Sequence, residues 1–90
     1  MSTIISSVEI RNIVGSRVRH ARRTTKPRIT QRDLVARLQV LGMVIDQSGL
    51  SKIENGQRAV SDIEVVALAK ALKVSVAWLF EGTSTPSISQ

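Results

Sequence analysis

A helix-start pattern that recurs four times is the strongest constraint on the fold. At each occurrence a helix-capping residue directly follows one apolar residue and stands four positions before another, which is the arrangement of a hydrophobic staple. The caps with their apolar partners are Thr30 with Ile29 and Leu34, Asp46 with Ile45 and Leu50, Ser61 with Val60 and Val65, and Ser75 with Val74 and Leu79. Ser61 with Glu64 also resembles a capping box, as does Thr30 with Asp33. The pattern predicts four helices that begin at these caps.

A fifth helix is expected ahead of these four, from about Asn12 to about Arg23. Its apolar stripe consists of Val14, Val18 and Ala21. Helix ends in the left-handed conformation are expected at Gly56 and Gly82, and the second helix is expected to run on to Leu41 and stop at Gly42. No segment alternates apolar and polar residues as a half-buried strand does. The sequence therefore predicts an all-α chain that folds as a compact five-helix bundle.

Ninety residues fit one domain. We expect this domain to span residues 12–82, after a flexible N-terminal tail of residues 1–11. Residues 83–90 are rich in Ser and Thr and contain Pro86, which is typical of a flexible tail or of the start of a linker. Such a linker would lead to a C-terminal sensor domain beyond Gln90.

Positive charge is concentrated in the first part of the chain. Residues 1–40 carry nine basic and two acidic side chains, whereas residues 41–90 carry four basic and five acidic ones. This asymmetry favours a polyanionic partner, and the alternative is a solvated basic surface.

The residue inventory argues against an enzyme. The chain has no cysteine and a single histidine, and its carboxylates are scattered, so we find no metal-ligand cluster and no nucleophile beside a base. A glycine loop that cradles phosphates is also missing. No stretch is apolar over the length of a membrane span, and no signal peptide is recognised. We expect a cytoplasmic protein without a cofactor.

The helix expected after Asp46 has one apolar and one polar side. Its polar side carries Gln47, Ser48, Ser51 and Lys52. A glutamine amide matches the donor and acceptor of adenine, lysine suits guanine or phosphate, and serine suits several bases. The side chains on this side are therefore candidates for contact with DNA bases, and the alternative is an ordinary solvated helix face.

Five short segments stand in a specific order between residues 13 and 82. They are GSRVR at 15–19, TQ at 30–31 with Leu34, LSKIENG at 50–56, LAKAL at 68–72 and VSVAWLF at 74–80. Together they resemble the phage-repressor and Cro type of helix-turn-helix protein, also called the xenobiotic-response-element family. The resemblance implies a lambda-repressor-like bundle whose third helix lies in the major groove, with its first residues at base edges.

On matching positions, the resemblance implies base contacts by Gln47 and Ser48, with Lys52 one turn further on. It implies phosphate contacts by Gln31, at the start of the second helix, and by Asn55 after the third. Further candidates for phosphate contact are Arg17, Lys26, Arg28 and Arg58, each of which is alternatively a solvated surface charge.

Glu54 is acidic on a helix that otherwise faces DNA. A carboxylate that faced the phosphates would be repelled, but Glu54 lies one turn after Leu50 and can turn inward. Its counterpart in the family pairs with an arginine of the first helix, which by position is Arg22. We therefore expect a structural ion pair and not a catalytic acid.

The sequence departs from the usual family pattern in two places. The connection between the second and third helices contains QVLGMV at 39–44 and is about five residues longer than the commonest form. Val35 stands where the family usually has alanine, close to the helix crossing. Both differences bear on where the third helix lies.

The sequence-based interpretation is a transcriptional regulator that binds a double-stranded DNA operator as a homodimer with two-fold related half-sites. Repression is expected over activation, on the resemblance alone. The alternative is a protein-interaction module, such as an antitoxin whose main partner is a protein. An exposed apolar patch without a basic face around the third helix would favour that alternative.

Overall fold

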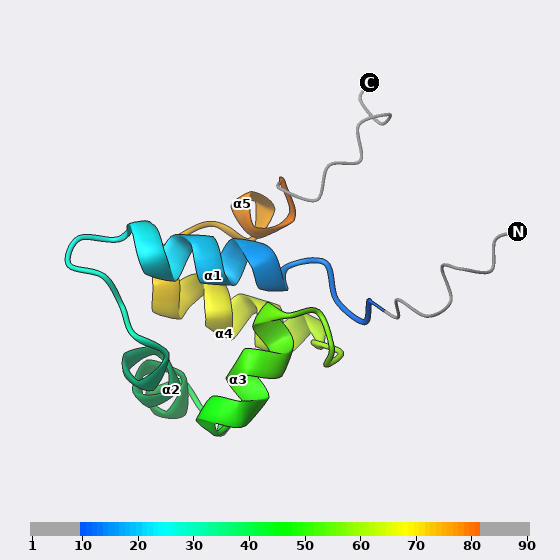
Figure 1. Ribbon diagram of the computed structural model, residues 1–90, viewed down its shortest axis with the longest axis horizontal. Helices are drawn as coiled ribbons and strands as arrows, with labels where there is room; N and C mark the ends of the chain where they lie inside the picture. The colour runs from blue at the N-terminus through cyan, green and yellow to red at the C-terminus, as the bar shows by residue number, and fades with distance from the viewer. Residues whose placement is uncertain (1–9, 82–90) are drawn as a thin grey trace, which may run out of the picture.

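The computed structural model describes residues 10–81, and this range folds into five helices (Figure 1). They are α1 (Gly15–Thr24), α2 (Gln31–Val40), α3 (Gln47–Glu54), α4 (Asp62–Leu72) and α5 (Val76–Glu81). No strand occurs among the described residues, so the prediction of an all-α five-helix chain is confirmed. The expected stop at Gly82 and the tail at 83–90 lie outside the described residues, as does most of the tail expected at 1–11.

Both predicted capping boxes are formed. The Thr30 hydroxyl accepts from the backbone N–H of Asp33, whose carboxylate accepts from the N–H of Thr30. Ser61 and Glu64 make the same reciprocal pair at the start of α4. The backbone hydrogen bond from Thr30 lowers the pKa of Asp33, because it favours the charged carboxylate.

The two remaining predicted caps are also made. The Asp46 carboxylate accepts from the N–H of Gly49 at 2.7 Å, and the Ser75 hydroxyl accepts from the N–H of Trp78 at 3.0 Å. All eight apolar partners of the four caps are buried in the core or packed against it. The apolar residues that flank each cap therefore also anchor the start of each helix to the core.

α1 begins three residues later than the expected start near Asn12. The reason is the Asn12 side chain, whose Oδ1 accepts from the N–H of Gly15 at 2.7 Å. Its Nδ2 donates to the carbonyls of Ile53 and Arg58, at 3.0 and 2.8 Å. Asn12 thus joins the approach to α1 to the last turn of α3 and to the connection after it, instead of continuing the helix.

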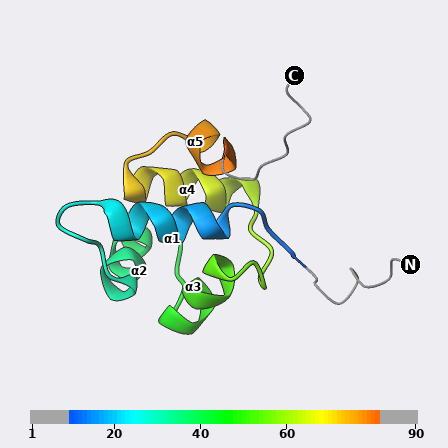
Figure 2. The same ribbon diagram turned by 45° about the horizontal axis from the view of Figure 1, so that its top comes forward.

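The helices surround one aliphatic core. α1 and α4 lie side by side, with α3 and α5 on opposite sides of α1 (Figures 1 and 2). The largest fully buried apolar side chains are Val14, Val18, Leu34, Leu38, Leu50, Ile53, Leu68 and Leu79. A side chain at Gly15 would collide with the carbonyl oxygen of Ile53, so glycine is what lets α1 begin directly against the end of α3.

The long α2–α3 connection, residues 41–46, is well defined. α2 ends at Val40 with Leu41 as its C-cap, and Gly42, where the helix was expected to stop, has a φ of +91°. The N–H of Met43 donates to the carbonyl of Leu38 at 2.9 Å, and the Met43 side chain enters the core. This turn sets the position from which α3 departs.

Candidate nucleic-acid interface

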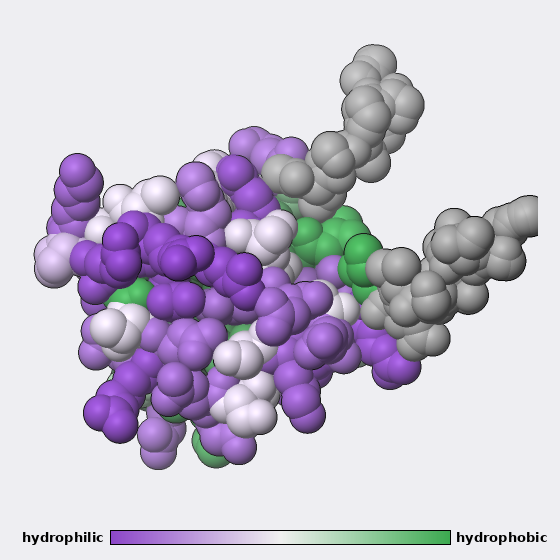
Figure 3. Space-filling model, in the orientation of Figure 1, coloured by the Kyte–Doolittle hydropathy of each residue, from purple (hydrophilic) through white to green (hydrophobic). Residues whose placement is uncertain are grey.

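An open hollow lies where α1, α2 and α3 meet. It is lined by Arg19, Arg22, Arg23, Arg28, Thr30, Gln31, Arg32, Gln47 and Glu54. The lining contains five arginines and one carboxylate, which makes its electrostatic potential positive. The face of the molecule that shows α1, α2 and α3 is largely hydrophilic (Figure 3).

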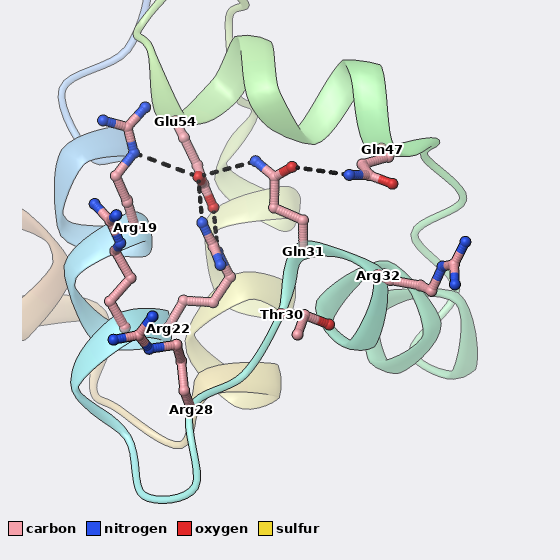
Figure 4. A pocket seen from close by; sticks show the side chains of 9 residues that line it. Arg19, Arg22, Arg28, Thr30, Gln31, Arg32, Gln47 and Glu54 are labelled. Carbon is pink, nitrogen blue, oxygen red and sulfur yellow. Dashed lines mark hydrogen bonds and ion pairs between the residues drawn. The ribbon is translucent and has the colours of Figure 1, made fainter.

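Glu54 is the centre of this hollow. Its side chain is fully buried and is held by the guanidinium of Arg22 through two hydrogen bonds of 2.7 and 2.9 Å (Figure 4). A third Arg22 nitrogen donates to the carbonyl of Ile29 at 3.1 Å. The structure therefore contains the inward pair that the resemblance implied. The pair joins α3 to α1 and to the residues that lead into α2.

Gln31 extends the pair toward the start of α3. Its Nε2 donates to Glu54 Oε1 and to the hydroxyl oxygen of Ser51, at 3.1 Å in both cases. Its Oε1 accepts from Gln47 Nε2 at 3.2 Å. A continuous chain of hydrogen bonds thus runs from Arg22 through Glu54 and Gln31 to Gln47 (Figure 4).

The direction of this chain follows from chemistry. A carboxylate can only accept, so Gln31 must turn its NH₂ group toward Glu54 and its oxygen toward Gln47. Gln47 must then turn its own NH₂ group toward Gln31. This leaves one N–H and the Oε1 atom of Gln47 available at the exposed start of α3.

The other base-contact candidates divide into two groups. Ser48 and Lys52 are exposed on α3. Ser51 is half-buried, and its hydroxyl is engaged with Gln31. The geometry thus presents Gln47, Ser48 and Lys52 outward and uses Ser51 inside the α2–α3 contact.

A comparison with known protein families identifies the family to which this arrangement of helices belongs. Residues 20–79, which include all of α2, α3 and α4, match the helix-turn-helix family. The chain belongs to the phage-repressor and Cro type of helix-turn-helix protein. No curated protein and no solved structure matches the chain. The helix-turn-helix family consists of DNA-binding transcription regulators and is generally non-enzymatic. Membership of this family assigns DNA-binding transcription regulation to the chain at the family level.

Among the predicted phosphate contacts of this helix-turn-helix protein, Gln31 and Arg28 line the hollow, and Asn55 is joined to it through Arg19. Its Oδ1 accepts from Arg19 at 2.6 Å, and Arg19 Nε lies 3.5 Å from Glu54. The amide nitrogen of Asn55 thereby points away from Arg19, as a donor to an anion would. Arg28 lines the hollow and is exposed, and Lys26 is exposed in the loop before α2.

Arg58 is held inside the helix-turn-helix domain. Its guanidinium donates twice to the carboxylate of Glu64, at 3.1 and 3.0 Å. The hydrogen bonds from Arg58 lower the pKa of Glu64, which supports the capping box of α4. The structure thus gives Arg58 a structural partner, and its predicted phosphate contact would require that pair to open or to be shared.

Arg17 does not line the hollow and contacts α5 instead. Its guanidinium stacks 3.6 Å from the centroid of the Trp78 ring, and its Nε donates to the Trp78 carbonyl at 3.2 Å. His20 stacks against the same indole with ring centroids 6.1 Å apart. Arg17 is thus placed to attach α5 to α1 instead of pointing at the start of α3.

Replacing Arg17 with Ala should therefore lower the free energy of unfolding by about 1 to 2 kcal/mol, through loss of the cation–π contact and its hydrogen bond. Urea unfolding followed by far-ultraviolet circular dichroism measures this change. Arg23→Ala is the matched control on the same helix, since Arg23 is exposed, and should change stability by less than about 0.5 kcal/mol. Equal effects of the two substitutions would show that the Trp78 contact contributes nothing.

Three arginines of the hollow were not identified from the sequence. Arg19, Arg23 and Arg32 all line it, although none matches a family contact position. Arg19 and Arg23 are four residues apart and so share a face of α1 with Arg22 close by, and this spacing was the available signal.

None of the described helices has both the length and the apolar character needed to cross a membrane.

Proposed function

We propose that this helix-turn-helix protein binds double-stranded DNA in a sequence-specific manner, with α3 in the major groove. The observation that carries the proposal is the hydrogen-bond chain from Glu54 to Gln47 beside the arginine-lined hollow. Phosphates need cations and backbone amides, whereas base edges need a fixed donor and acceptor. The junction of α2 and α3 supplies both within one surface.

The fixed amide of Gln47 favours adenine as its base. One Gln47 N–H is used on Gln31, which leaves one donor and one acceptor side by side. In the major groove adenine presents N7 as an acceptor and N6 as a donor, which matches this pair. Ser48 and Lys52 are placed to contact neighbouring bases or phosphates on the same exposed side.

Phosphate binding is proposed at the start of α2 and around the hollow. The side chain of Gln31 is committed to Glu54, Ser51 and Gln47, so its phosphate contact would come from its backbone N–H in the first turn of α2. Arg28, Lys26 and Asn55, together with Arg19, Arg23 and Arg32, complete the proposed phosphate-binding surface.

The regulator is proposed to act in the cytoplasm as a homodimer on two half-sites, and to repress by blocking access of polymerase to the promoter. The family membership of the chain supports DNA as its partner. The two-fold symmetry of operators with two half-sites supports a dimer. The antitoxin-like alternative is not favoured, because a basic hollow does adjoin α3.

Titration with duplex DNA tests the proposal. After selection of a preferred operator from random duplexes, log affinity should fall linearly with log salt concentration, with a slope of about −0.9 for each phosphate contacted. Arg28→Gln, at the hollow, should make the slope shallower by about one contact per protomer. Lys70→Gln removes the same charge from the outer side of α4 and should leave the slope unchanged on a duplex with a single half-site, which one protomer can bind. An affinity that is independent of salt would rule out DNA as the partner.

A further inference from the structure

Five large hydrophobic side chains are exposed together on one surface away from the hollow. Val40, Leu41 and Val44 come from the end of α2 and the connection after it, and Ile63 and Val66 come from the outer side of α4. Their exposed fractions are 85%, 44%, 81%, 77% and 43%. We call these five residues the α2–α4 apolar surface.

Two depressions shape this surface. One is lined by Leu41, Val44 and Ile63, with Gly42, Met43, Glu64 and Ala67. The other is lined by Arg37, Val40, Leu41, Lys70, Ala71 and Lys73. Leu41 lines both depressions, and between them they contact residues along most of α4.

Neither the core nor the proposed DNA contact accounts for this surface. The long connection places Met43 in the core but leaves Leu41 and Val44 in water. Aliphatic side chains gain nothing from phosphates, and none of the five lines the arginine-rich hollow. Exposed aliphatic residues that gather in one place mark a surface that another apolar surface covers.

The charges along α4 indicate what covers it. Asp62, Ile63, Val66 and Lys70 share the exposed side of α4, because their spacing follows the helical repeat, and the exposed Lys73 directly follows the last residue of the helix. Asp62 stands at one end of this stripe, and Lys70 and Lys73 stand at the other. Within residues 10–81, the side chains of these three charged residues make no hydrogen bond or ion pair.

A stripe with opposite charges at its two ends is complementary to itself when two copies run antiparallel. Two-fold symmetry places each Asp62 near Lys70 and Lys73 of the second copy and brings the two Val66 side chains close to the axis. The connections of residues 41–46 then flank the paired helices with Leu41 and Val44.

We propose that the α2–α4 apolar surface is the homodimer interface, formed by two antiparallel α4 helices. The inference deepens the proposed function by assigning a surface to its homodimer. The surface and the hollow have no residue in common, so the dimer forms without occupying the DNA-binding residues.

Sedimentation velocity of the full chain without DNA tests the interface. The wild-type chain should dimerise, and Ile63→Asp should raise the dissociation constant of the dimer by at least about tenfold, because it buries a carboxylate beside Val66. Ile63 is outside the core, so helix content should be unchanged. Ile13→Asp is the matched control, since Ile13 is 54% exposed near the start of α1 and should leave the dissociation constant unchanged.

A charge exchange tests the antiparallel arrangement. Asp62→Lys and Lys70→Asp should each weaken the dimer several-fold, because each places like charges opposite one another. The chain that carries both substitutions should recover most of the wild-type affinity, which a purely local effect on α4 would not produce. A lack of recovery would overturn the antiparallel pairing.

Two outcomes would overturn the interface itself. One is a wild-type chain that stays monomeric at about 100 µM, and the other is a dimer that Ile13→Asp dissociates and Ile63→Asp does not. Binding of a duplex with a single half-site is measured in parallel, because one protomer suffices for it. Retained half-site binding by a monomeric chain would reject the interface and leave the DNA-binding function standing.

Discussion

Glu54→Ala is expected to lower the free energy of unfolding by about 3 to 5 kcal/mol. The substitution removes a fully buried carboxylate and leaves the guanidinium of Arg22, whose side chain is 11% exposed, without its partner. It also removes one of the two acceptors of the Gln31 Nε2 group, whose other acceptor is the Ser51 hydroxyl. A buried charge that loses its partner costs far more than the pair itself contributes, since the desolvation of the guanidinium is no longer offset.

Urea unfolding at neutral pH measures this effect. Glu81→Ala is the matched control, because Glu81 is an exposed glutamate at the end of α5 and should change stability by less than about 0.5 kcal/mol. Arg22→Met combined with Glu54→Leu should cost much less than Glu54→Ala alone, because it removes both charges. An unfolding curve that Glu54→Ala leaves in place would refute the role of the buried pair.

The local features of the fold could be predicted because each depends on residues close together in the sequence. A staple and its cap span six residues, and the side chain of Thr30 or Ser61 needs only the next helical turn to make its bonds. The start of α1 was predicted too early for the opposite reason. It is set by bonds from Asn12 to Ile53 and Arg58, more than 40 residues away.

The same distinction applies to the site. The sequence and its family resemblance led to Arg22 and Glu54 as an ion pair, and to Gln31 and Gln47 as separate candidates for phosphate and base contact. Their union into one chain of hydrogen bonds depends on how α1, α2 and α3 pack, which no local pattern encodes. Arg17 was a candidate for phosphate contact by charge alone, but packing of α5 supplies Trp78 as its partner.

The hydrogen-bond chain changes what is expected of Gln31. From position alone, Gln31 was a phosphate contact that carries no sequence information. In the structure its oxygen accepts from the Gln47 amide and so fixes which way that amide faces. Gln31→Ala keeps the backbone N–H proposed to contact phosphate, so its main expected effect is the loss of part of the preference at the base that Gln47 contacts.

Gln47→Ala should reduce affinity for the preferred operator by about 1 to 3 kcal/mol, which is up to about 100-fold, and should relax the preference at one base pair in each half-site. The reason is that its free N–H and Oε1 stand at the start of α3, where base edges are within reach. Affinities are measured on the operator and on its single-base variants, at one salt concentration. Gln39→Ala is the matched control, because Gln39 is exposed near the end of α2, away from the hollow.

The pattern of losses across these duplexes decides where α3 lies. A loss confined to one base pair for Gln47→Ala, with a smaller loss at the same base pair for Gln31→Ala, would support the hydrogen-bond chain as the device that orients the reading amide. If Gln47→Ala weakened every duplex equally, α3 would not occupy the groove in the proposed register. The cause would then lie in residues 41–46, because this long connection sets where α3 begins relative to α2.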